Sequence, residues 1–196
     1  MAEAPVIETS GLSKRYGPVQ ALNDLNLAVR PGDIFGFLGP NGAGKTTTIR
    51  LLLDLIRPTR GHARVLGLDT RSQSLEMRRR VGYMAGEVAL YEQMTGGELL
   101  SLLSDLRGGG HLPRARKLAG RLDLDLKRRI GDYSSGMKQK LALIAALSPA
   151  AELLILDEPT KGLDPLVQLE VYAILAEERA RGCTVFFSSH ILPEVE

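Results

Sequence analysis

The sequence contains a single cysteine, Cys183, so no disulfide can form within the chain and a reducing compartment is favoured. Long apolar runs are also missing: the longest, Leu141 to Leu147, is far shorter than the roughly 20 residues of a membrane-spanning helix. The first residues lack the basic and apolar regions of a signal peptide, and we expect none. Lys plus Arg number 25 and Asp plus Glu 23, a balance that does not indicate a nucleic-acid partner. With 44% hydrophobic residues among 196, the composition indicates one globular domain with a real core.

A glycine-rich segment has the spacing of a phosphate-binding loop, in which Gly and four residues precede Gly-Lys-Thr. The apolar run 34–38 before it predicts a buried strand, and the segment 47–55 after it predicts a helix, which is the context that the motif requires. Its residues are Gly39, Pro40, Asn41, Gly42, Ala43, Gly44, Lys45 and Thr46.

The residue types of this loop suit a nucleoside triphosphate with Mg²⁺. Glycines let the backbone come close to phosphate, and the N–H groups of the turn and of the helix start donate to its oxygens. We expect Lys45 to neutralise charge on the β- and γ-phosphates and the Thr46 hydroxyl to ligate Mg²⁺.

Two adjacent carboxylates, Asp157 and Glu158, end the apolar run 153–156. Side chains alternate along a strand, so the two carboxylates aim in different directions. Asp157 can then face the metal beside Thr46, and Glu158 the water that attacks the γ-phosphate. Taken alone, the pair could simply end a strand at the surface; the phosphate loop upstream favours the functional reading.

A second anion-binding element is predicted where small residues precede an apolar helix. Ser134, Ser135, Gly136 and Met137 lie at that helix start, where free N–H groups attract phosphate. The alternative is an ordinary serine-capped helix.

Strand patterns gather at both ends of the chain and helical patterns fill the middle. Short strands are predicted at 6–9, 25–29, 81–84 and 184–188, and Thr95 with Glu98 has the pattern of a capping box that opens a helix toward Leu106. We expect another helix between Asp164-Pro165 and Gly182. The fold class is therefore α/β, with a core at about 1–89 and 148–196 and a helical insert at about 90–147.

The chain resembles, over essentially its whole length, the ATP-binding domain of ABC (ATP-binding cassette) transporters. Gly39 to Thr46 matches Walker A, and Asp157 with Glu158 matches Walker B and its catalytic glutamate. Further matches are the signature at Ser134 to Met137, the D-loop at Gly162-Leu163-Asp164, the switch histidine at His190 and the adenine-stacking aromatic at Tyr16. The wording around the signature is most similar to bacterial ABC-2 cassettes for drug or antibiotic efflux.

The resemblance implies a P-loop NTPase (RecA-like) core, an N-terminal antiparallel β subdomain and a helical insert that carries the signature. It also implies a head-to-tail dimer with ATP between Walker A of one copy and the signature of the other. Glu158 and His190 would be catalytic, Thr46 and Asp157 would hold Mg²⁺, and Tyr16, Thr47, Ser134, Ser135, Gly136, Met137 and Asp164 would join the phosphate loop in binding nucleotide.

The sequence departs from the family pattern in several places. Ser135 stands for a glycine and Met137 for a glutamine in the signature. Gly86 stands at the usual Q-loop glutamine, whose coupling or metal-shell work the neighbouring Glu87 would take over. The chain ends at Glu196, earlier than family members do, and we expect a shortened protein or a fragment.

Our leading hypothesis is an ATPase subunit that powers export through a separate transmembrane permease. Such a subunit would be cytoplasmic, peripheral on the inner face of the cell membrane and attached only through the permease. One alternative is a nucleotide-gated dimerisation module with little hydrolysis, against which Glu158 and His190 argue. The other is a soluble ABC ATPase acting on ribosomes or DNA, which commonly has paired cassettes or long coiled coils. The transported substrate is chosen by the permease and is not encoded here.

Overall fold

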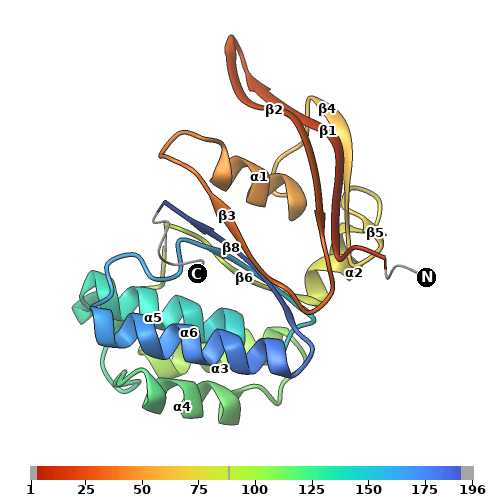
Figure 1. Cartoon of the computed structure of the whole chain (residues 1–196). Helices are drawn as coiled ribbons and strands as arrows, with labels where there is room; N and C mark the ends of the chain where they lie inside the picture. The colour runs from red at the N-terminus through yellow and green to blue at the C-terminus, as the bar shows by residue number, and fades with distance from the viewer. Residues whose placement is uncertain (1–3, 88, 191–196) are drawn as a thin grey trace.

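The computed structural model describes residues 4–87 and 89–190 and arranges them in layers (Figure 1). An antiparallel sheet lies at one side, a parallel sheet crosses the middle, and helix α1 (Lys45–Leu52) lies between the two sheets. Helices α5 (Ser135–Leu147) and α6 (Pro165–Ala180) cover the other face of the parallel sheet. Outside them lie α3 (Gly96–Leu106) and α4 (Leu112–Arg121).

The antiparallel sheet has the strand order β2-β1-β4-β5. Strands β1 (Ile7–Tyr16) and β2 (Val19–Val29) form a long hairpin, and β4 (Arg60–Val65) pairs with the other edge of β1. The short β5 (Leu68–Asp69) completes this sheet. Only part of the hairpin was predicted, and its tip extends away from the rest of the molecule (Figure 1).

The parallel sheet has the order β3-β8-β7-β6, so strands distant in sequence become neighbours. Its strands are β3 (Ile34–Leu38), β6 (Val81–Met84), β7 (Leu153–Asp157) and β8 (Thr184–Ser189). Because these strands run parallel, their carboxyl ends meet at one edge, which is where open α/β sheets bind ligands. Asp157 pairs with Ser188 at that edge.

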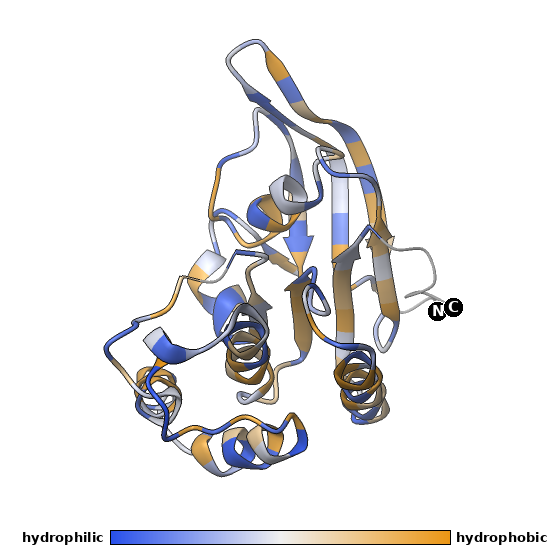
Figure 2. Ribbon diagram, turned by 90° about the vertical axis from the view of Figure 1, so that its left-hand side faces the viewer, coloured by the Kyte–Doolittle hydropathy of each residue, from blue (hydrophilic) through white to orange (hydrophobic). Residues whose placement is uncertain are grey.

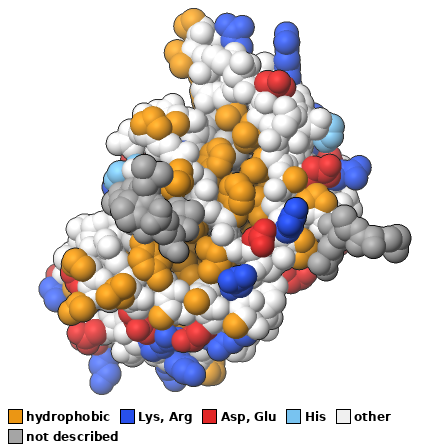
Figure 3. Space-filling model, in the orientation of Figure 1, with side chains coloured by type: hydrophobic (Ala, Val, Ile, Leu, Met, Phe, Trp, Pro, Cys, Tyr) orange, Lys and Arg blue, Asp and Glu red, His pale blue; other side chains and the backbone are white. Residues whose placement is uncertain are grey.

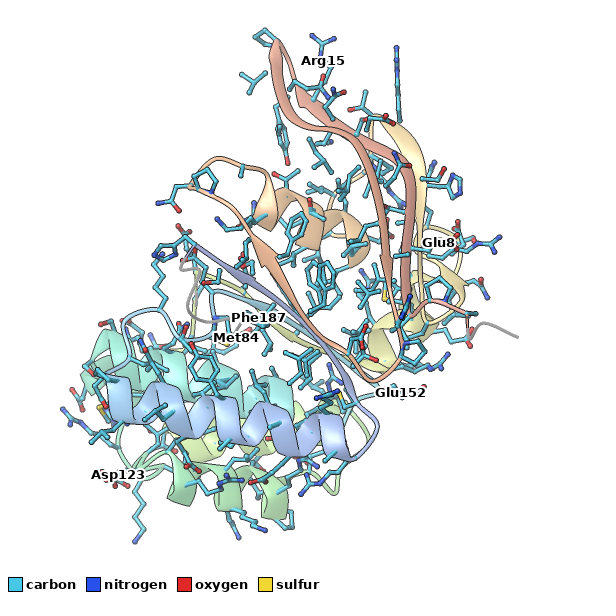
Figure 4. The ribbon with its side chains drawn as sticks, viewed as in Figure 1. Glu8, Arg15, Met84, Asp123, Glu152 and Phe187 are labelled. Atoms are coloured by element: carbon cyan, nitrogen blue, oxygen red, sulfur yellow. The ribbon has the colours of Figure 1, made fainter. Side chains whose placement is uncertain are left out.

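Successive side chains of the parallel strands point to opposite faces of the sheet, so the hydrophobic core lies partly on each face. Leu153 and Ile155 pack with Phe186 on the side of α1 and the antiparallel sheet. Leu154 and Leu156 pack with Phe187 and Met84 against the helices. Phe187 and Met84, labelled in Figure 4, lie on the two strands that flank β7. A sheet buried on both faces explains the continuous apolar runs of its strands. Figure 2 shows hydrophobic residues concentrated in these strands and hydrophilic ones spread over loops and outer helices.

The predicted α/β fold class is confirmed, including the antiparallel sheet of N-terminal segments and the helical stretch from α3 through η1 (Ile130–Asp132) to α5. Strands 34–38 and 81–84 have the predicted bounds, and the capping box of Thr95 and Glu98 is formed. The elements not predicted are β4, β5 and α2 (Ser74–Arg79), which are short and mostly polar. The core and insert boundaries stay a prediction.

Candidate nucleotide site

The phosphate loop connects the carboxyl end of β3 to the first turn of α1. Gly42 and Gly44 have φ values of 85° and 87°, in the left-handed region that favours glycine. A Cβ on Gly44 would lie 2.5 Å from the Ala21 carbonyl oxygen of β2. The loop is thus pressed against the β1–β2 hairpin, and the N–H groups of the α1 start are presented at the sheet edge.

Lys45 lies inside the loop rather than in solvent, with only 6% of its surface exposed. Its Nζ donates to the carbonyl oxygens of Gly39 at 2.6 Å and Pro40 at 3.1 Å. The ammonium group is therefore held by the backbone of its own loop.

Asp157 is 2% exposed and is held by two hydroxyl groups. Thr46 Oγ1 donates to its Oδ2 at 2.7 Å, and Ser188 Oγ donates to its Oδ1. Hydroxyl and carboxylate oxygens are hard ligands, and Mg²⁺ is commonly held by one or two of them together with phosphate oxygens. The donor set at Thr46 and Asp157 fits Mg²⁺ in this way. Among residues 4–87 and 89–190, no cluster of three or more His, Cys, Asp or Glu forms a separate metal cage.

Glu158 lies beside the loop among basic groups. Its Oε1 is 3.2 Å from His190 Nδ1 and 4.0 Å from Lys45 Nζ, and its Oε2 is 3.5 Å from Lys161 Nζ. The side chain is 14% exposed, and its backbone has a φ of 50°. The carboxylate is thus close to the phosphate loop yet reachable by water, which suits a group that accepts a proton from water.

Two cavities flank the loop and share Asn41, Thr46 and Glu158. One, of about 280 Å³, is also lined by Arg50, Tyr83, Ala85, Gly86, Glu87, Asp157 and Lys161. The other, of about 350 Å³, is also lined by Val19, Gln20, Ala21, Gly42, Gly44, Lys45 and Thr47. Together they bring the predicted Walker A, Walker B and Q-loop residues to one edge of the parallel sheet.

Gly86, which stands where the family has a glutamine, lies close to the side chain of Asp157. A Cβ on Gly86 would lie 3.1 Å from Asp157 Cγ, which is a tight contact. Glu87 lines the 280 Å³ cavity and is exposed. That Glu87 takes the place of the Q-loop glutamine stays a prediction.

Tyr83 lines the same cavity. Burial, and then the charge of Asp157, raise the pKa of its hydroxyl.

Tyr16 does not line either of these two cavities. It is 46% exposed at the end of β1, and Lys14 Nζ lies 5.0 Å from the centre of its ring. Val19, Gln20 and Ala21 of β2 line the cavity instead, and the sequence did not single them out. Adenine stacking by Tyr16 stays a prediction.

The signature residues lie at the start of α5 and do not line these two cavities. Ser134 Oγ accepts a hydrogen bond from the Met137 N–H at 3.2 Å, so the serine-capped helix is real. Asp164 likewise caps α6, because its Oδ1 accepts from the Val167 N–H at 3.0 Å. Ser134 and Ser135 are exposed, which leaves them accessible to a group outside the chain.

Other residues of the site were not predicted. Ser188 and Lys161 contact the two carboxylates, and the Gln139 side chain donates to the Glu158 carbonyl oxygen at 2.9 Å. Gln139 lies two positions after the signature residues Ser134 to Met137, but the sequence assigned it no role, and Ser188 and Lys161 lie outside the predicted site motifs. Each of the three contacts depends on strand order or helix packing.

Comparison with known proteins agrees with the geometry. The family model described as ABC transporter matches residues 22–161. A bacitracin transport ATP-binding protein of Enterococcus faecalis is 40% identical over 195 residues, 97% of this chain and 63% of that protein. A daunorubicin resistance ATP-binding protein of Streptomyces coeruleorubidus is also 40% identical, over 97% of this chain and 61% of its own length. The chain thus spans a little over three-fifths of these curated relatives.

Solved structures give the same result. The ATP-binding subunit of an ABC transporter superposes with a TM-score of 0.86 at 32% identity, over 96% of this chain and 80% of that one. A bacterial ABC transporter cassette solved as a dimer gives a TM-score of 0.88 at 22% identity, over 96% and 90% of the two chains, and supports the fold. Since the family model covers most of the sequence and the more similar subunit is matched over most of its length, the chain belongs to the ABC transporter family.

Proposed function

We propose that the chain binds and hydrolyses MgATP to power export through a separate transmembrane subunit. The observation that carries the proposal is the position of Glu158, whose carboxylate lies between His190 and the phosphate-loop lysine. A loop that merely binds nucleotide needs no carboxylate at this point, whereas hydrolysis requires a group that takes a proton from the attacking water.

The phosphate loop would bind the triphosphate of the nucleotide. Its N–H groups and the amino end of α1 would donate to the phosphate oxygens, with Lys45 on the β- and γ-phosphates. Thr46 and Asp157 would hold Mg²⁺, which when bound neutralises negative charge on the phosphates. Tyr16 at the hairpin would stack on adenine.

Hydrolysis would be in-line attack of water on the γ-phosphorus, with ADP as the leaving group. Glu158 would accept the proton of the attacking water, and His190 would hold the γ-phosphate and water in place. Lys45 and Lys161 offset the charge of Glu158, so that a carboxylate can lie near an anionic substrate.

A second copy would complete each site. Ser134 and Gly136 would contact the γ-phosphate bound by the partner, because they lie exposed or half-exposed at a helix start and do not line the two cavities over this chain's own loop. Apolar side chains are exposed toward the amino end of α6 (Figure 3), where Leu166 and Leu169 are 79% and 64% exposed. A relative of this fold has been solved as a dimer.

Export is proposed from the names of the relatives, which include bacitracin transport and daunorubicin resistance proteins. In the described part of the chain, no helix combines the length and the hydrophobicity needed to cross a membrane. From the names of these relatives we propose that the chain acts at the cytoplasmic face of the cell membrane through a permease subunit, which would choose the cargo.

The test is ATP turnover by the purified protein with the variant Glu158→Gln. The amide keeps the size of the side chain but cannot take up the proton, so we expect a rate about 10²- to 10⁴-fold lower, with nucleotide binding retained. Glu76→Gln, at an exposed position of α2, is the matched control and should hydrolyse at the wild-type rate. Wild-type turnover by Glu158→Gln would contradict the proposal.

A further inference from the structure

Gln139 is a polar side chain buried in an apolar helix. It is 7% exposed and precedes Leu141, Leu143 and Ile144 on α5, all of them fully buried. A buried amide is costly unless it is hydrogen-bonded. Its Nε2 donates to the carbonyl oxygen of Glu158 at 2.9 Å, and this bond joins α5 to the residue that follows β7.

The backbone of Glu158 needs such support. Its φ of 50° is in the left-handed region, which residues other than glycine, asparagine and aspartate rarely adopt. Such a conformation persists only where surrounding contacts enforce it. The Glu158 N–H donates to Ser188, to its Oγ at 3.0 Å and its carbonyl oxygen at 3.2 Å, and the Glu158 carbonyl accepts from Gln139 and from the Lys161 N–H.

Within residues 4–87 and 89–190, the hydrogen bond of Gln139 to the site reaches only the Glu158 backbone. Ser188 also donates to Asp157, so its removal would disturb the metal-binding carboxylate as well. The Lys161 N–H belongs to the turn that Glu158 itself begins. Of the described hydrogen bonds to the Glu158 backbone, the one from the Gln139 side chain comes from a helix, α5.

Helix α5, which carries Gln139, packs closely on its neighbours near both of its ends. A Cβ on Gly82 of β6 would lie 2.3 Å from the Ala146 carbonyl oxygen, so the helix packs directly on the strand backbone. At its other end, a Cβ on Gly136 would lie 3.3 Å from the Gly162 carbonyl oxygen. The helix is therefore packed closely on β6 near its carboxyl end and on the loop that follows Glu158 at its amino end.

We propose that Gln139 is a positioning residue that holds the left-handed backbone of Glu158, and so aims its carboxylate between Lys45 and His190. The inference rests on the proposed role of Glu158 in ATP hydrolysis. Gln139 does not contact the phosphate loop in any hydrogen bond of the described residues, so it should affect the hydrolytic step and not the affinity for nucleotide.

The first experiment measures kcat and KM for MgATP in Gln139→Met, which keeps the side-chain volume and removes the donor. We expect kcat to fall about 10- to 100-fold, since small misplacements of a reacting group cost rates of this order, with KM within about twofold. The matched control is Gln168→Met, because Gln168 Nε2 donates to the Thr160 and Leu163 carbonyls of the same loop at 3.4 and 3.1 Å but not to Glu158. It should keep kcat within about twofold.

A second measurement does not depend on activity. Without nucleotide, amide hydrogen exchange at Glu158 and Lys161 should become roughly fivefold faster in Gln139→Met and stay unchanged in Gln168→Met, because one local hydrogen bond is lost. A wild-type kcat or unchanged exchange in Gln139→Met would overturn the inference. If Glu158→Gln is impaired while Gln139→Met is not, only the inference fails; if Glu158→Gln turns over normally, the proposed function itself fails.

Discussion

The neighbouring carboxylates Asp157 and Glu158 have different surroundings. Asp157 is buried and accepts hydrogen bonds from Thr46 and Ser188, which suits a metal ligand of fixed direction. Glu158 is partly exposed and lies within 4.0 Å of three basic groups, which suits exchange of a proton with water. The two carboxylates thus differ in environment, and the separate roles proposed for them rest on that difference.

At residue scale, position 44 requires glycine for two independent reasons. Its φ is 87°, and a Cβ would lie 2.5 Å from the Ala21 carbonyl oxygen. We expect Gly44→Ala to shift the loop away from the hairpin and weaken MgATP binding at least tenfold, because a rigid backbone neighbour cannot yield to the added methyl group. Equilibrium titration with a fluorescent ATP analogue measures this change.

Gly42→Ala is the matched control for backbone strain. Gly42 has a φ of 85°, but nothing lies within 4 Å of its Cβ position. It carries only the conformational cost of a left-handed residue, about 1–2 kcal/mol. If both variants weaken binding equally, the contact with Ala21 does not matter.

At the scale of elements, the start of α3 depends on its capping box. Thr95 Oγ1 accepts from the Glu98 N–H at 3.2 Å, and Glu98 Oε2 accepts from the Thr95 N–H at 2.7 Å. We expect Thr95→Ala to lower the free energy of unfolding by about 1 kcal/mol, because an N–H of the first turn loses its acceptor. Urea unfolding measures the loss, and Thr95→Ser should retain most of the stability.

At the scale of the molecule, carboxylates that join separate elements make stability depend on pH. Glu152, shown in Figure 4, lies before β7 and forms a bidentate pair with Arg80 after α2, at 2.7 Å for each contact. Glu177 of α6 pairs with Arg121 of α4. The hydrogen bonds from these arginines lower the pKa of both carboxyls below the ordinary glutamate value of 4.5.

A lowered pKa in the folded state means that the unfolded state binds more protons in acid. The contribution to stability is therefore complete above pH 4.5 and is lost as the pH falls through the folded-state pKa. We expect the free energy of unfolding to decrease below pH 4.5, and to decrease less in Glu152→Gln. Denaturant unfolding at several pH values measures this, and Arg80→Gln should flatten the acid dependence in the same way. An unfolding free energy that does not change in acid would contradict the assignment.

Much of the fold could be predicted because strong local patterns mark the buried strands and the helix caps. The strands 34–38 and 81–84 and the box at Thr95 depend on residues close together in sequence. Strand β4 could not be predicted, because only Ala63 and Val65 in it are buried and its pairing with β1 supplies the rest of its stability. The role of Tyr16 rests on sequence resemblance, since its ring is not at the cavities.

The sequence by itself determined the phosphate loop, because eight consecutive residues fix that backbone and its donors. Only the tertiary structure decided which groups meet the loop. Thr46 and Asp157, which are hydrogen-bonded, are 111 positions apart in the sequence. Glu158 and His190, whose side chains are in contact, are 32 positions apart. They meet because the order β3-β8-β7-β6 brings distant strand ends to one edge, and the packing of α5 on β6 brings Gln139 to Glu158. Such proximity is a property of non-local packing, which no stretch of sequence read alone contains.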